Sequence, residues 1–85
     1  MKKIKVKSKD IKSFEIEVKD LTMDERILVT ECIHKINLEP ARIFALSVEI
    51  CVIGTGLNKE DLNEYSRSQL YALAKDIYDL AEKKS

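Results

Sequence analysis

Two short segments near the start of the chain alternate apolar and charged residues. They are KIKVK at residues 3–7 and FEIEV at residues 14–18. A period of two gives a strand one apolar face and one solvated face. Because a polar, turn-compatible segment separates them, we expect an antiparallel β-hairpin over residues 3–18, with lysines beside glutamates on its solvated face.

After the hairpin the period changes to that of a helix. Thr22 is followed three residues later by Glu25, which is the spacing of a capping box that satisfies free amides at a helix start. We therefore expect a helix over residues 23–37. Its core face is predicted from apolar residues at helical spacing, namely Leu28, Val29, Cys32, Ile33 and Ile36.

The next segment is apolar around most of a helical circumference, and we expect a helix over residues 40–53. Pro40 suits the first turn of a helix, and Gly54 or Gly56 supplies the left-handed residue that commonly ends one. Such a helix is either central in the fold or covered by a partner. Its β-branched content leaves a buried strand within residues 44–53 as the alternative.

The end of the chain predicts two further helices. A short helix is expected over residues 58–65, and a longer one over residues 67–83 begins at a second capping box formed by Ser66 and Gln69. The expected fold class is therefore α+β. A single domain over residues 1–85 would carry an N-terminal antiparallel hairpin followed by three to four helices.

Charge is distributed unevenly along the chain, although the formal net charge is zero. Residues 1–12 contain six lysines and one aspartate, which gives +5, so the rest of the chain carries −5. Phosphate contact by these lysines is one interpretation. Alternating lysines without arginine or aromatic residues among them are more typical of a guarded sheet edge, so nucleic acid is not the expected partner. The candidate electrostatic contact comprises Lys3, Lys5, Lys7 and Lys9.

Catalytic and metal-binding patterns are absent from the sequence. The only histidine, His34, lies two residues after Cys32, and positions i and i+2 of a helix point about 200° apart, so the two cannot form a dyad. The GTG segment at residues 54–56 lacks a phosphate-loop pattern. We expect no enzyme activity, cofactor, metal or small-molecule substrate. Cys32 and Cys51 are expected to be reduced and buried, with a disulfide as the alternative.

Membrane insertion is also not expected. The longest apolar run, around Ile50 to Ile53, is far shorter than the roughly 20 residues that cross a bilayer. The initial lysines are not followed by the apolar core of a signal peptide. We therefore expect a chain that is neither membrane-spanning nor exported by that route.

The apolar helix at residues 40–53 is the main functional candidate. If the hairpin and the other helices leave part of it uncovered, the exposed remainder marks a protein-binding surface; otherwise it is simple core. The opposite charges of the lysine-rich start and the acidic remainder also favour self-association. The candidate protein interface is the flank formed by Phe44, Val48, Cys51 and Val52.

The order of a strand pair, VKDLTMDERILVTECI, an apolar helix and GLNKEDLNEYSRSQLYALAKDIYDLA resembles small tail-assembly chaperones and related morphogenesis proteins of tailed bacteriophages. Leu21, Thr22 and Glu25 carry the likeness, together with the later acid-rich turn and SRSQLYALA. The resemblance implies a non-catalytic factor that binds tail-tube or tape-measure subunits in the host cytoplasm or within the virion. The alternatives are a small structural component of head, neck or tail, and a nucleic-acid-associated regulator that uses the N-terminal lysines.

Overall fold

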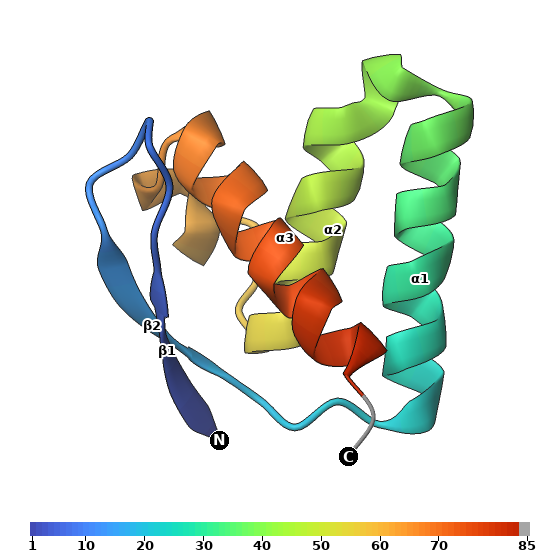
Figure 1. Cartoon of the computed structure of the whole chain (residues 1–85), viewed down its shortest axis with the longest axis horizontal. Helices are drawn as coiled ribbons and strands as arrows, with labels where there is room; N and C mark the ends of the chain where they lie inside the picture. The colour runs from blue at the N-terminus through green and yellow to red at the C-terminus, as the bar shows by residue number, and fades with distance from the viewer. Residues whose placement is uncertain (84–85) are drawn as a thin grey trace.

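A two-stranded antiparallel sheet packs on one side of a group of three α-helices (Figure 1). The structure is a computed structural model and describes residues 1–83. Both the α+β class and the N-terminal hairpin are confirmed. In chain order the elements are β1 (Lys2–Val6), β2 (Phe14–Val18), α1 (Met23–Leu38), the 3₁₀ helix η1 (Pro40–Arg42), α2 (Ile43–Thr55), the 3₁₀ helix η2 (Asp61–Glu64) and α3 (Arg67–Glu82).

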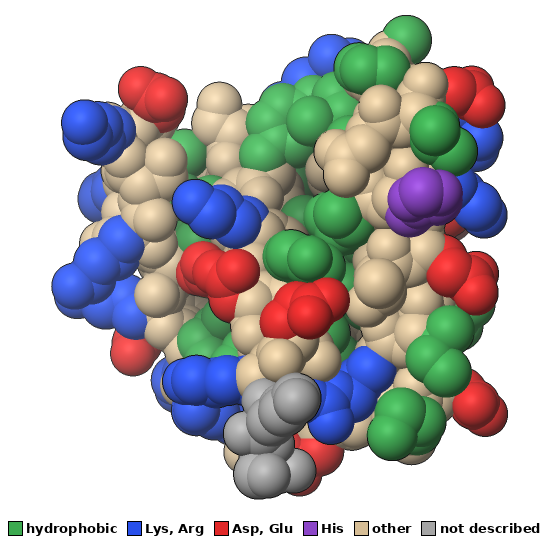
Figure 2. Space-filling model, turned by 45° about the vertical axis from the view of Figure 1, so that its right-hand side comes forward, with side chains coloured by type: hydrophobic (Ala, Val, Ile, Leu, Met, Phe, Trp, Pro, Cys, Tyr) green, Lys and Arg blue, Asp and Glu red, His purple; other side chains and the backbone are tan. Residues whose placement is uncertain are grey.

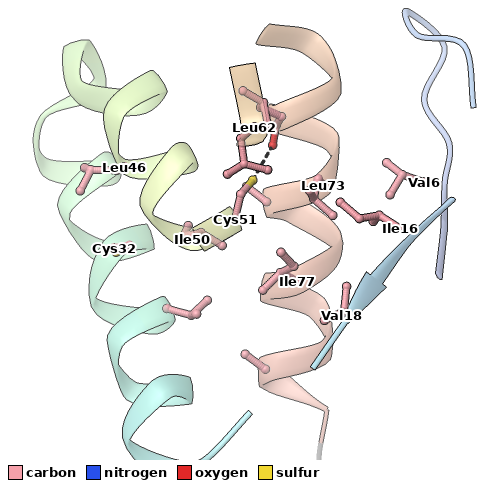
Figure 3. Packing of buried hydrophobic residues seen from close by; sticks show 14 residues of the cluster. Val6, Ile16, Val18, Cys32, Leu46, Ile50, Cys51, Leu62, Leu73 and Ile77 are labelled. Atoms are coloured by element: carbon pink, nitrogen blue, oxygen red, sulfur yellow. Dashed lines mark hydrogen bonds between the residues drawn. The ribbon is translucent and has the colours of Figure 1, made fainter. Parts of the chain in front are cut away.

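The register of the hairpin sets lysines against glutamates, as the alternation predicts. Lys3 lies opposite Glu17, and Lys5 lies opposite Glu15, on the solvated face of the sheet. Opposite charges across an antiparallel pair stabilise it modestly. The other face turns its apolar side chains toward α3, as Figure 3 shows for Val6, Ile16 and Val18.

Both predicted capping boxes are present. The backbone N–H of Glu25 donates to Thr22 Oγ1 at 3.2 Å, and the backbone N–H of Thr22 donates to Glu25 Oε1 at 3.0 Å. Ser66 and Gln69 make the same reciprocal bonds at 3.1 and 2.8 Å. These bonds satisfy amides that have no partner inside a helix, so α1 and α3 begin where the sequence predicts.

The chain between α1 and α2 departs from the single helix predicted over residues 40–53. Pro40–Arg42 form a 3₁₀ turn, in which the backbone N–H of Arg42 donates to the carbonyl oxygen of Glu39 at 2.9 Å. Such 3₁₀ turns are frequent at the ends of α-helices, and this one precedes the first regular turn of α2 at Ile43. The alternative of a buried strand in this segment is wrong.

Two other boundaries differ from the prediction. Helix α2 continues through Gly54 to Thr55 and ends at Gly56, which adopts the left-handed conformation with φ of 75°. The short helix predicted over residues 58–65 is the 3₁₀ turn Asp61–Glu64.

Helix α1 contacts the core through a narrower face than predicted. Val29 and Cys32 are buried, and Ile33 and Ile36 are partly buried. Leu28, however, is 47% exposed, so its assignment to the core face was wrong. At about 100° per residue it lies beside the arc that Val29 and Ile36 share, on the solvent side.

The core lies between the hairpin and α1, with α2 and α3 in its centre (Figure 3). Its buried apolar side chains come from both strands, the three α-helices and η2. They are Val6, Ile16, Val18, Val29, Cys32, Leu46, Ile50, Cys51, Leu62, Leu70, Leu73, Ala74, Ile77 and Ala81.

Gly54 allows α2 and α3 to approach each other closely. A Cβ placed on Gly54 would lie 2.5 Å from Cδ1 of Ile77 and 2.8 Å from both Cγ1 and Cγ2. The carbonyl oxygen of Gly54 also accepts a hydrogen bond of 2.9 Å from the backbone N–H of Lys19, just after β2. One glycine therefore sets the helix contact and joins the hairpin to it.

Arg26 joins the start of α1 to the end of α3. Its Nε donates to the carbonyl oxygen of Ala81 at 2.9 Å, and its Nη2 donates to the carbonyl oxygen of Lys83. The last carbonyls of a helix have no partner within the helix and carry the negative end of its dipole. A guanidinium therefore satisfies both the hydrogen bonds and the charge there.

We predict that Gly54→Ala lowers the free energy of unfolding by about 1–3 kcal/mol, because the added methyl overlaps the buried Ile77 side chain. Urea unfolding measures the change. In the double variant Gly54→Ala with Ile77→Ala, the methyl occupies space that the smaller side chain leaves, so the loss should be smaller than the sum of the single losses. Additive losses would contradict the contact.

The carboxylate of Glu25 should stabilise the fold in a pH-dependent way. Its hydrogen-bonded ion pair with Lys19, and then its bond from the Thr22 amide, hold its pKa below the ordinary value of 4.5. A carboxyl with a lowered folded-state pKa stabilises above its ordinary pKa, and this stabilisation is lost as pH falls through the lowered value.

We therefore expect Glu25→Gln to unfold at lower urea concentration than the unsubstituted chain at pH 7, and the difference to shrink below about pH 4.5. Glutamine retains the acceptor of the capping box, so the comparison isolates the charge. A difference that stays constant from neutral to acid pH would contradict this account.

Candidate functional site

Helix α2 carries the four residues predicted as a protein interface, and the structure separates one of them from the rest. Cys51 is fully buried, so the prediction is wrong for this residue. Its thiol points toward α3 and donates to the carbonyl oxygen of Leu70 at 3.4 Å (Figure 3). Phe44, Val48 and Val52 are only partly buried, and their spacing of four places them along one side of the helix.

These three side chains line two neighbouring hollows. The first, of about 320 Å³, contains Phe44 and Val48 and is completed by Lys59, Leu62, Asn63, Tyr65, Arg67 and Leu70. The second, of about 410 Å³, contains Val52 and is completed by Glu49, Ile53, Asn58 and Lys59. Because Lys59 borders both, we treat the two hollows together as the α2 groove.

Aromatic contacts fix one end of the α2 groove. The guanidinium carbon of Arg67 lies 4.4 Å from the ring centroid of Phe44. The ring of Tyr71 meets that of Phe44 edge to face, with centroids 6.1 Å apart and planes at 86°. A guanidinium stacked on a ring keeps its in-plane N–H groups free to bind an acceptor. Arg67 is therefore held in place as a donor at the rim.

The rest of the rim is also rich in donors. Lys59 supplies a second cation between the two hollows. Tyr65 adds a phenol, whose pKa is raised by burial and then by the neighbouring carboxylate of Glu64. Apolar side chains form the floor, so the groove suits an apolar side chain that lies next to a carboxylate or carbonyl oxygen.

The predicted electrostatic group is exposed but does not form a uniformly cationic surface. Its two members within β1 lie opposite Glu15 and Glu17, whose charges reduce the local positive potential. The other two lie in the loop that joins the strands. A role of the group in electrostatic contact stays a prediction, and its members are Lys3, Lys5, Lys7 and Lys9.

The two thiols and the histidine do not line the α2 groove. Cys32 and Cys51 are free and buried, as predicted, and the thiol of Cys32 lies 3.8 Å from Glu49 Oε2. His34 is exposed on α1. In residues 1–83, no three His, Cys, Asp or Glu side chains are grouped so that they could hold a metal ion. Among the helices of this part of the chain, none has both the length and the apolar character for a membrane crossing.

Sequence reasoning missed the outer wall of the groove. Lys59, Asn63, Tyr65 and Arg67 belong to η2 and its flanks, and no periodicity there indicates which side chains face α2. The available signal was the pair Leu62 and Tyr65, which places apolar side chains in the connection between α2 and α3. It predicts that the connection folds back on the core, without giving its side-chain directions.

Comparisons of this chain with protein-family models, with curated proteins and with solved structures found no match. The α2 groove is therefore interpreted from its own geometry.

We predict that Cys51 reacts at least about a hundredfold more slowly with iodoacetamide in the folded chain than in urea at pH 8. Burial raises the pKa of its thiol from 9.0 to about 12, which lowers the thiolate population about a thousandfold. Peptide mass spectrometry would measure alkylation at each cysteine. Equal rates for Cys51 in the folded and unfolded chain would show that the thiol is accessible.

Proposed function

We propose that this chain is a non-catalytic protein-binding factor and that the α2 groove holds its partner. The observation that carries the proposal is the row of Phe44, Val48 and Val52, whose side chains remain partly exposed within two adjoining hollows. Partly exposed apolar side chains bordered by hydrogen-bond donors are typical of protein-binding surfaces.

The biological setting that we propose is the assembly of a tailed phage, most specifically its tail. The support is the resemblance of the chain's segments to tail-assembly chaperones. In this setting the chain acts in the cytoplasm of the host cell or is incorporated in the virion.

The shape and chemistry of the groove favour an amphipathic helix as the bound segment. Its apolar residues at spacings of three and four would occupy the two hollows, and an acidic residue would meet Lys59 or Arg67. In helix-in-groove binding, the apolar face of the helix provides the anchors, and charged contacts at the edge orient the helix. The proposed partner is accordingly a tail-tube or tape-measure subunit with such a segment.

The test is binding of the purified chain to the full-length tail-tube and tape-measure proteins of the proposed phage, measured by calorimetry. Val48→Asp and Val52→Asp should each weaken binding at least about tenfold, because a carboxylate replaces an apolar anchor in the groove. Ala45→Asp is the matched control, since it introduces the same charge at an exposed apolar position of α2 outside the groove.

Two results would overturn the proposal. One is the absence of binding to either full-length protein by the unsubstituted chain. The other is binding that survives both groove substitutions unchanged, in variants whose circular dichroism shows that they are folded.

A further inference from the structure

The exposed apolar side chains of the molecule gather on α1, outside the α2 groove. Six large hydrophobic side chains are exposed in residues 1–83; four lie on α1, Ile43 is the first residue of α2, and Met1 lies away from both helices. The other five are Met23 at 68%, Ile27 at 49%, Leu28 at 47%, Leu38 at 69% and Ile43 at 43%. Exposed apolar residues are ordinary when scattered, but a concentration on one helix marks an interaction surface.

These residues lie on the side of α1 that faces away from the core. At about 100° per residue, Met23, Ile27, Glu31, His34 and Leu38 fall within an arc of about 80°. Val29, Cys32 and Ile36 lie on the opposite side, against α2 and α3. We call the first arc, with Leu28 and Lys35 at its edge, the outer face of α1.

Apolar and polar residues alternate in blocks along this outer face. Met23, Ile27 and Leu28 form an apolar block at the start of α1, while Leu38 and Ile43 form another where α1 turns into α2. Between them lie polar side chains. Figure 2 turns α1 toward the viewer and shows green side chains at the lower and upper parts of this face, with the histidine between them.

We propose that the outer face of α1 binds a second copy of this chain, with the two α1 helices antiparallel about a two-fold axis. Such an axis brings the same patch of both copies together, so the patch must complement itself. Antiparallel pairing sets the first apolar block of each copy against the second block of the other. In a parallel pairing, each residue would face the same residue of the second copy. Glu31 would then face Glu31 and Lys35 would face Lys35, so like charges would meet.

Charge in the middle of the face supports this arrangement. Glu31 and Lys35 are both exposed and lie one turn apart. With the two-fold axis between their levels, Glu31 of each copy faces Lys35 of the other, and the pair occurs twice. The same axis sets Leu28 against Leu38 of the second copy, so charge and apolar matching agree on one position of the axis.

The size of the surface indicates a weak dimer. The 16 residues of α1 span about 24 Å, which limits the contact to the small end of specific interfaces, below about 1,200 Å². We therefore expect a monomer–dimer equilibrium that depends on concentration. This inference stands apart from the proposed function, because it uses a different helix face and needs no foreign protein.

Sedimentation velocity from about 1 to about 500 µM, a range that spans weak association, tests the dimer. The unsubstituted chain should shift from monomer to dimer with concentration. Ile27→Asp and Leu38→Asp should each weaken self-association at least about tenfold, because each places a carboxylate in an apolar block. Val52→Asp, in the α2 groove, should leave the equilibrium unchanged.

A charge swap tests the position of the axis. Glu31→Lys and Lys35→Glu should each weaken the homodimer, because each brings like charges together twice. The double variant should restore it. An equimolar mixture of the two single variants should also restore association, as a heterodimer with every pair opposite in charge.

A chain that remains monomeric throughout this range would overturn the proposal. So would an oligomer insensitive to Ile27→Asp and Leu38→Asp, or single charge reversals that no swap restores. A monomer in which Ile27→Asp abolishes binding of a tail protein would assign the outer face to a foreign partner instead. Groove variants that lose tail-protein binding but retain the dimer would uphold both proposals separately.

Discussion

The contact between Gly54 and Ile77 sets the distance between α2 and α3, and the other elements are arranged around that pair of helices. The hairpin packs on α3 and is joined by hydrogen bond to the carbonyl oxygen of Gly54. Helix α1 packs on α2 from the other side. A glycine inside a helix costs roughly 0.5–1 kcal/mol relative to alanine, and close packing offsets that cost.

Composition indicates which helix lies at the centre of the fold, but not which helix exposes apolar side chains. Helix α2 is apolar around most of its circumference, yet α1, α3 and β2 cover it, and only one row of side chains remains partly open. Helix α1 has many charged residues, yet it carries the most exposed apolar side chains. Overall hydrophobicity therefore indicates which helix is central. A second apolar stripe, on the side opposite the core stripe, indicates which helix exposes apolar side chains to solvent.

Local signals in the sequence determined most of the fold. The capping residues Thr22 and Ser66 gave both helix starts, and the strand alternation gave the hairpin with lysines beside glutamates on its solvated face, because these signals depend on neighbours within a few residues. The burial of Cys51 and the exposure of Leu28 depend instead on how each helix is rotated about its own axis relative to elements that are distant in the sequence. The hydrophobic periodicity of the sequence gives that rotation only to within about one residue, or about 100°. Met23 and Ile27 carried a usable signal, since they are four residues apart and lie opposite Val29.

The hydrogen bonds of Arg26 have a consequence for the order in which the fold is completed. Its guanidinium, near the start of α1, binds the carbonyl oxygen of a residue 55 positions later. During synthesis, α1 and α2 are made before the acceptors on α3 exist. The apolar side chains of the hairpin, α1 and α2 that pack against α3 therefore stay uncovered until α3 has been made. A chain with exposed apolar side chains on α1 and a partly open row on α2 is consequently open to mispairing before α3 is in place.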